Sequence, residues 1–304
     1  MHDKLVMLQR HWRWLRADGV RGYAEEHDLN PAVRIPRDLR KFFWARAHGT
    51  RGAGVPVFVF GAQRSGTNMM MHGLDMAPEV RVYNEGNARA FERYRIRPQP
   101  VIERLVARSA SRVVAFKPLC DSHRVTEILD GLDSIQPPRA FWIWRGVEGR
   151  VRSAVAKFPT SNLDVLRSWA RGGARDHWQL QGISDDSRAF LVGLDVAALS
   201  PESAAAAFWY IRNRLVLERG LDRRPDVMLI SYDLFLQEPA PWMRRIAAFA
   251  GLDHRPELIA HVKPSLSLRH QRPSVPIAPE ILERCRALEE RLRTLTERQR
   301  ETVG

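Results

Sequence analysis

Cysteine is scarce in this chain, and a long apolar run is missing. The 304 residues include only two cysteines, Cys120 and Cys285, and these lack metal-ligand spacing. Neither a disulfide framework nor a metal site is therefore expected, and a reducing compartment is favoured. No apolar stretch approaches the length of a membrane span, and the first residues lack the apolar core of a signal peptide. We therefore expect a cytoplasmic protein without a membrane span.

Negative charge is also in short supply. Lys and Arg together number 48 against 35 for Asp and Glu, which gives a formal net charge of +13, most of it from arginine. Such a field attracts anions, whether nucleic acid, an acidic substrate, a membrane surface or an anionic cofactor, although a solvated basic surface would give the same sum. The apolar and charged fractions are ordinary, so the chain is expected to be globular.

Short apolar segments alternate with helical patterns along most of the chain. Strands are expected at Val57–Phe60, Val80–Tyr83, Arg112–Phe116, Ala140–Trp144 and Val227–Ile230, and helices near Gly66–Ala77, Ser122–Leu132, Gly149–Phe158 and Glu202–Arg219. This alternation predicts an α/β fold with a central, mostly parallel sheet flanked by helices. Ligands of such sheets bind beyond the carboxyl ends of the strands.

The chain divides by pattern into two parts. Residues 1–54 predict an N-terminal helical arm, and residues 55–304 predict the α/β domain. Within that domain, residues 159–195 interrupt the alternation and form either an acceptor-side insert or an ordinary surface excursion. One apolar stripe near the C-terminus predicts a helix packed on the core: Ile281, Cys285, Leu288, Leu292 and Leu295.

The first informative motif is a turn between a strand and a helix. Gly61 and Gly66 have the Gly-x-x-x-x-Gly spacing of a nucleotide phosphate loop, whose backbone N–H groups and following helix dipole favour an anion. A loop that binds ATP continues with Lys and then Ser or Thr, which helps to hold Mg²⁺. Here Thr67 and Asn68 occupy those positions, and the cation is Arg64 inside the loop. The turn therefore predicts a cradle for a less charged phospho-anhydride than the triphosphate of ATP.

The second motif follows the strand at residues 140–144. That strand ends at Arg145, and Ser153 lies eight residues later, about two turns into the next helix. A planar guanidinium fork and a hydroxyl donor suit a terminal phosphate group.

Both motifs resemble those of the sulfotransferases that use 3′-phosphoadenosine 5′-phosphosulfate (PAPS). The run Gln63-Arg64-Ser65-Gly66-Thr67-Asn68 is similar to their 5′-phosphosulfate loop, although the family often has a second Thr where this chain has Asn68. Arg145 with Ser153 resembles their 3′-phosphate signature. The segment 64–85 is similar to tyrosylprotein and other Golgi-type sulfotransferases. The resemblance spans about residues 55–252, and its specific content lies in the two anion motifs.

The resemblance implies transfer of a sulfuryl group from PAPS to a hydroxyl or amine, without a metal. The implied acceptor is a small molecule, a glycan or a peptide. Glu85 would be the general base, while Arg64 and Lys117 would stabilise the transferring group. The implied donor-binding residues are Gln63, Arg64, Ser65, Gly66, Thr67, Asn68, Met69, Arg145, Ser153 and Tyr232.

Several alternatives remain open from the sequence. Asp121 and His123 are other candidate bases, and the basic loop 263–273 could either contact the 3′-phosphate or be solvated. The alternative functions are a nucleoside-triphosphate-dependent kinase with an altered phosphate loop, and a non-catalytic binder of polyanions or nucleic acid. No RNA- or DNA-binding motif is present, so a nucleic-acid partner is not expected. The acceptor and the oligomeric state are not encoded in any motif.

Overall fold

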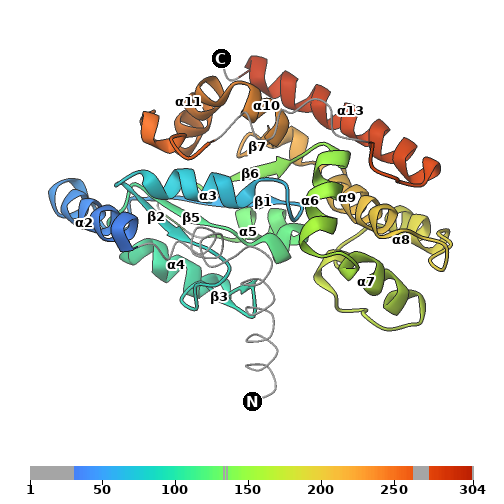
Figure 1. Ribbon diagram of the computed structural model, residues 1–304. Helices are drawn as coiled ribbons and strands as arrows, with labels where there is room; N and C mark the ends of the chain where they lie inside the picture. The colour runs from blue at the N-terminus through green and yellow to red at the C-terminus, as the bar shows by residue number, and fades with distance from the viewer. Residues whose placement is uncertain (1–30, 133, 135, 263–273, 303–304) are drawn as a thin grey trace.

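The computed structural model describes residues 31–132, 134, 136–262 and 274–302. Figure 1 shows a central sheet with helices on both of its faces. The strands are β1 (Val55–Gly61), β2 (Val80–Tyr83), β3 (Phe91–Glu92), β4 (Arg95–Ile96), β5 (Val113–Phe116), β6 (Arg139–Trp144) and β7 (Val227–Ser231). The α-helices are α2 (Pro31–His48), α3 (Thr67–Met76), α4 (Gln99–Arg108), α5 (Val125–Gly131), α6 (Val147–Lys157), α7 (Ser161–Ala170), α8 (Asp185–Val192), α9 (Pro201–Glu218), α10 (Tyr232–Gln237), α11 (Pro239–Ala250) and α13 (Pro279–Thr302). Short 3₁₀ helices are η1 (Leu119–Arg124), η2 (Trp178–Leu180), η3 (Leu221–Arg223) and η4 (Pro256–Leu258).

The central sheet confirms the predicted fold class. Its strand order is β2-β5-β1-β6-β7, and every neighbouring pair is parallel. The five predicted strands are all present, with ends that differ from the prediction by no more than two residues. β3 and β4 form a separate antiparallel pair. Because the strands of the central sheet are parallel, their carboxyl ends share one edge, and the predicted site residues follow several of those ends.

The strands are apolar without clean alternation because both faces of the sheet are covered. In β1, the side chains of Val57 and Val59 are buried in one cluster with residues of α3 and α11. Phe58 and Phe60 point to the opposite face and are buried with residues of α6, α9 and α13. The molecule is therefore a three-layer α/β structure.

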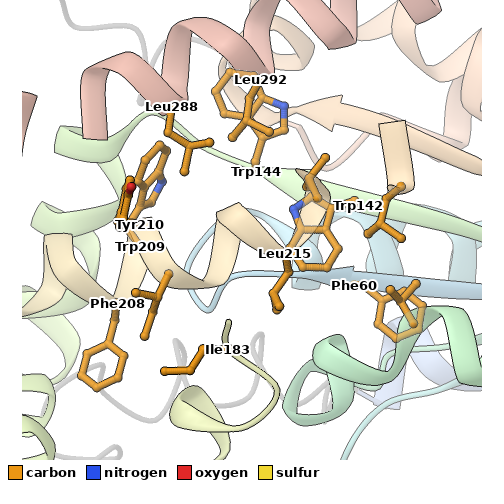
Figure 2. Close-up of a cluster of buried hydrophobic side chains, with 14 of the residues drawn as sticks. Phe60, Trp142, Trp144, Ile183, Phe208, Trp209, Tyr210, Leu215, Leu288 and Leu292 are labelled. Carbon is orange, nitrogen blue, oxygen red and sulfur yellow. The ribbon is translucent and has the colours of Figure 1, made fainter. Parts of the chain in front are cut away.

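Two buried tryptophans of β6 connect the sheet to α9 and α13, as Figure 2 shows. The Nε1 of Trp142 donates to Asn213 Oδ1 at 3.3 Å, and the Nε1 of Trp144 donates to Thr296 Oγ1 at 3.0 Å. Each ring therefore buries its apolar surface while its one polar group keeps a partner. All five residues of the predicted C-terminal stripe are buried in the same cluster, so the expectation of core packing for α13 is confirmed.

The segment 159–195 is more regular than its composition suggests. It contains α7, η2 and α8. Ser184 caps α8 by accepting a hydrogen bond from the Ser187 N–H, and two acidic residues in the first turn favour the positive end of the helix dipole.

Helix α2 contacts the domain through charged side chains. Arg37 Nη1 lies 2.6 Å from Asp75 Oδ2 on α3, and Lys41 also pairs with Asp75. The aromatic side chains of Phe42 and Phe43 are largely exposed. The division of the chain into an arm and a domain at residue 54 remains a prediction.

Two features are absent from the described residues. None of the helices there is both long enough and apolar enough to span a bilayer. The same residues hold no cluster of three or more His, Cys, Asp or Glu side chains placed to bind a metal ion.

Truncating Leu292 tests whether α13 is part of the core. We expect Leu292→Ala to lower the free energy of unfolding by about 2–5 kcal/mol, because the lost side chain leaves a cavity in the cluster that holds Trp144. Urea denaturation measures this change. The control is Arg291→Ala at the exposed neighbouring position, for which the expected change is within about 0.5 kcal/mol. Equal effects of the two substitutions would show that α13 does not stabilise the core.

Candidate functional site

The turn between β1 and α3 has a constrained backbone. A Cβ atom at Gly61 would lie 2.2 Å from the carbonyl oxygen of Ile143 on the adjacent strand, so only glycine fits there. Gly66 has φ +98° and Arg64, which is not a glycine, has φ +70°. Side chains other than glycine rarely adopt this left-handed conformation, which persists where surrounding contacts hold it and is concentrated at functional sites.

The N-terminus of α3 is open to a ligand. Gly66 is its N-cap residue and supplies no side-chain cap. The first N–H groups of a helix have no intrahelical acceptor and carry partial positive charge. Thr67, Asn68 and Met69, which the sequence predicts as donor-binding residues, are the first three residues of α3. Ser65 is fully buried. The structure thus has a helix start without a side-chain cap at the position where the motif predicts an anion-binding site.

Arg150, a residue to which the sequence reading gave no role, anchors this turn. Its guanidinium is fully buried, with Nε donating to the Gln63 carbonyl oxygen at 3.0 Å and Nη1 donating to the Ala205 carbonyl oxygen at 2.7 Å. Burial, together with the nearby charge of Arg64, lowers the pKa of Arg150 to about 10. At neutral pH Arg150 therefore remains a cation that ties the turn to α9.

Arg64 joins the two sequence motifs. Its Nε donates to Ser153 Oγ on α6 at 3.1 Å, across 89 residues of sequence. The first motif contributes the guanidinium and the second contributes the hydroxyl. The two stretches that the sequence predicts as separate anion contacts are therefore in direct contact with each other.

Tyr232 provides a second connection between the motifs. The guanidinium carbon of Arg145 lies 4.8 Å from the centre of the Tyr232 ring, a cation–π distance. A Cβ atom added to Gly66 would lie 2.2 Å from Cδ2 of the same ring, so the ring packs directly on the glycine. The Trp209 Nε1 donates to the Arg145 carbonyl oxygen at 2.7 Å and fixes the end of β6. Arg145 and the turn therefore both contact the Tyr232 ring.

The N-terminus of α6, in contrast to that of α3, is closed by carboxylates. Asp233 Oδ2 accepts from the Gly146 N–H at 2.6 Å, and Glu289 Oε2 accepts from the Val147 N–H at 2.9 Å. Burial is the main cause that raises the pKa of Glu289, and the charge of Asp233 raises it further. Asp233 Oδ1 also lies 4.0 Å from Nε of Arg145. The positive end of the α6 dipole is therefore already occupied by carboxylates of the chain itself.

Glu85 and Lys117 form an ion pair beside the start of α3. Lys117 Nζ lies 2.9 Å from Glu85 Oε2, and both side chains are mostly buried. Lys117 also donates to the side-chain oxygen of Asn68. The loop after β2 and the end of β5, which are neighbouring strands, thus bring a carboxylate and an ammonium group to the first turn of α3.

Of the two alternative bases, Asp121 is hydrogen-bonded to other groups, and His123 has a lowered pKa. Asp121 is buried, and its carboxylate accepts from Arg95 Nη1 at 3.1 Å and from the Ile96 N–H at 2.7 Å. Burial lowers the pKa of His123 to about 3, with further lowering by nearby arginines, first among them Arg212. A neutral imidazole of such low pKa is a weak proton acceptor near pH 7.

The structure thus brings the predicted site residues to one edge of the sheet, while the basic loop 263–273 lies outside the described residues. Sequence reasoning missed three contributors: Arg150, Asp233 and Glu289. A signal existed for Arg150, because it precedes Ser153 by three positions on a helix and so shares its face. No local signal identifies Glu289, which is 142 residues from the N–H that it accepts from.

Comparison with known proteins finds similarity among solved structures. A sulfotransferase from Alicyclobacillus acidocaldarius is 16% identical, with a TM-score of 0.46 over 81% of this chain and 96% of that one. The sulfotransferase domain from the curacin biosynthetic pathway is 15% identical, with a TM-score of 0.47 over 79% of this chain and 99% of that one. The sulfotransferase domain from the Synechococcus PCC 7002 olefin synthase is 12% identical, with a TM-score of 0.46 over 80% of this chain and 97% of that one. No protein-family model and no curated protein matches the chain. At such identities, similarity alone assigns no role to any residue of this chain.

The buried His123 makes folding stability depend on pH in a defined direction. Its folded pKa of about 3 is below the ordinary histidine value of about 6.5, so the unfolded chain binds this proton first as the pH falls. The contribution is constant above about pH 6.5 and is lost progressively between about pH 6.5 and pH 3. We expect His123→Gln to lose less stability than the wild type between about pH 7 and pH 4.5, measured by urea denaturation.

The matched control for this experiment is His254→Gln, at an exposed histidine. Its stability should fall with pH as steeply as that of the wild type. If His123→Gln kept the full acid sensitivity of the wild type, the low pKa of His123 would be wrong.

Proposed function

We propose that this chain is a sulfotransferase that uses PAPS as its donor. The observation that carries the proposal is that the two predicted anion motifs contact each other in the fold. Arg64 of the open turn donates to Ser153 of the second motif, and Tyr232 packs on both Gly66 and Arg145. A donor with an anionic group at each of two ends matches this pair of contacts.

The turn and the start of α3 would hold the phosphosulfate end of the donor. The Ser65 N–H already donates to the Ala62 carbonyl oxygen at 3.3 Å. The N–H groups of residues 66–69 would therefore supply the donors, without a lysine or a metal-binding hydroxyl in the ATP positions. Arg64 and Lys117 place cations on two sides of this helix start, with Lys117 fixed by Asn68 and Glu85. PAPS, when bound, would supply the sulfuryl group that passes to an acceptor hydroxyl or amine.

Arg145 and Ser153 would hold the 3′-phosphate. The guanidinium of Arg145 is mostly buried and is held in place by the Tyr232 ring and by Asp233. An arginine that is already ordered loses less side-chain entropy when a phosphate binds to its fork. Tyr232, between the two ends, would lie along the nucleotide.

Glu85 would accept the proton of the acceptor. Its carboxylate lies at the start of α3 with Lys117 2.9 Å away, so a proton acceptor and a cation for developing oxyanion charge stand together. Preorganised charges of this kind stabilise a transition state without reorganising during the reaction. Most of the rate would then come from positioning and electrostatics.

Arg145→Ala tests the assignment of the donor. We expect the affinity for adenosine 3′,5′-bisphosphate to fall by about 10- to 100-fold, the usual value of a charged hydrogen bond. The affinity for adenosine 5′-monophosphate, which lacks the 3′-phosphate, should change little. Isothermal titration calorimetry of the wild type and the variant with both nucleotides measures the difference.

Equal losses for the two nucleotides would show that Arg145 does not bind the 3′-phosphate. Titrations with ATP in the presence and absence of Mg²⁺ address the kinase alternative. Wild-type protein that binds ATP tightly only with Mg²⁺, and that fails to bind adenosine 3′,5′-bisphosphate, would overturn the sulfotransferase proposal.

Glu85→Gln tests the general base. We expect turnover to slow by about two to four orders of magnitude, the range for loss of a general base, with nucleotide affinity near that of the wild type. Release of adenosine 3′,5′-bisphosphate from PAPS would be followed with an acceptor selected from a panel of phenols, amines and saccharides. Glu92→Gln, an exposed residue of β3, is the charge-matched control with unchanged turnover. Normal turnover of Glu85→Gln would move the role to Asp121 or His123.

A further inference from the structure

A second basic site is separate from the candidate functional site described above. It is a hollow of 790 Å³ along the edge strand β2 and helix α4, which lie at the left of Figure 1. Its lining includes none of the residues that form the proposed donor site. Five arginines line it, and we call it the arginine pocket: Arg81, Arg89, Arg97, Arg104 and Arg108.

The charge of the arginine pocket is not neutralised within the described part of the chain. Among the described residues that line the pocket, none is Asp or Glu. None of the five arginines is within ion-pair distance of a carboxylate there, whereas arginines elsewhere, such as Arg95 and Arg224, are paired. Among the described residues, the five guanidinium groups therefore face a hollow without a counter-charge.

Some of these guanidinium groups are already ordered. Arg97 Nε donates to the Ala88 carbonyl oxygen at 3.0 Å, and Arg104 Nε donates to the Pro100 carbonyl oxygen at 3.1 Å. Arg81 lies over the ring of Tyr83 at 5.6 Å. Each of these contacts uses at most one N–H group and leaves the rest of the five-donor fork for a ligand.

A purely structural explanation accounts for only part of the cluster. A charged residue on an edge strand discourages pairing with other chains, and this explains Arg81 alone. Arg104 and Arg108 are four residues apart on α4, where like charges destabilise a helix. Arg89 and Arg97 come from the segments before and after β3 and β4. Four cations from outside the edge strand converge on one hollow, and an anionic ligand gives a common reason for them.

We propose that the arginine pocket binds a compact oligoanion that carries two or more phosphate or sulfate ester groups. The hollow has the size of a small-molecule site, and an arginine fork matches the oxygens of phosphate and sulfate esters. Val101 and Leu105 supply apolar lining suited to the carbon skeleton of a sugar or a cyclitol. Single-stranded nucleic acid fits less well, because it needs exposed aromatic rings for base stacking, and Tyr83 is buried.

Calorimetry with defined probes tests the proposal. Inositol hexakisphosphate carries phosphate esters and sucrose octasulfate carries sulfate esters, so the preference between them identifies the ester class. Inorganic phosphate serves as the single-anion probe and should bind far more weakly than either. We expect the double variant Arg104→Gln/Arg108→Gln, at two exposed positions of α4, to weaken the preferred probe by about tenfold or more. Arg89→Gln, at an exposed position outside the helix, should weaken it as well.

The matched control is Arg171→Gln/Arg188→Gln, which removes the same charge from two exposed positions outside the pocket. This variant should bind the probes within about twofold of the wild type. Equal weakening in both double variants would reduce the effect to net charge and overturn the proposal. The proposal would also fail if neither inositol hexakisphosphate nor sucrose octasulfate bound, or if inorganic phosphate bound equally well. Tighter binding of a single-stranded RNA oligonucleotide than of either probe would overturn it too.

The inference stands apart from the proposed enzymatic function. The double variant Arg104→Gln/Arg108→Gln should bind adenosine 3′,5′-bisphosphate with wild-type affinity, since these two side chains are not among the proposed donor-binding residues. Loss of adenosine 3′,5′-bisphosphate binding in this variant would show that the two sites are one, and would overturn the arginine pocket as a separate site.

Discussion

The geometry of the proposed donor site depends on the buried guanidinium of Arg150. This side chain joins the carbonyl oxygen of Gln63 in the turn to that of Ala205 in α9. Burying an arginine is costly unless its N–H groups are bonded, which agrees with its lowered pKa. The two hydrogen bonds of Arg150 fix the turn relative to α6 and α9. Without that anchor, the left-handed Arg64 would have no defined position opposite Ser153.

The N-termini of α3 and α6, both near the proposed donor site, differ in their electrostatics. The start of α3 lacks a side-chain cap, so its dipole is available to a ligand. The start of α6 is capped by Asp233 and Glu289, so its dipole is already neutralised. In the proposed complex with PAPS, this difference would distinguish the two anionic groups of the donor. One group would meet backbone N–H groups, whereas the other would meet the side chains of Arg145 and Ser153.

Local sequence patterns predicted the architecture because each strand carries its own signal. The strand at 80–83 was located from its apolar residues alone, and the glycines at 61 and 66 marked the turn that follows β1. The ion pair of Lys117 with Glu85 was not predicted, because it depends on β2 and β5 being neighbours in the sheet, which no local pattern encodes. The caps of α6 were not predictable, because Glu289 reaches its partner only through the tertiary packing of α13. The two helices within residues 159–195 were hidden by a polar composition that is also typical of loops.

The arginines that contribute most of the net charge of +13 have different structural roles. Some neutralise acids across elements, as Arg224 does with Asp130 and Asp226. Others, such as Arg150, support the backbone from the interior. The arginine pocket belongs to neither class, because no Asp or Glu of the described residues lines the hollow that its five guanidinium groups face. A uniformly solvated basic surface would spread such residues apart to reduce their repulsion. Their convergence along β2 and α4 therefore indicates that the excess charge is organised by binding as well as by solubility.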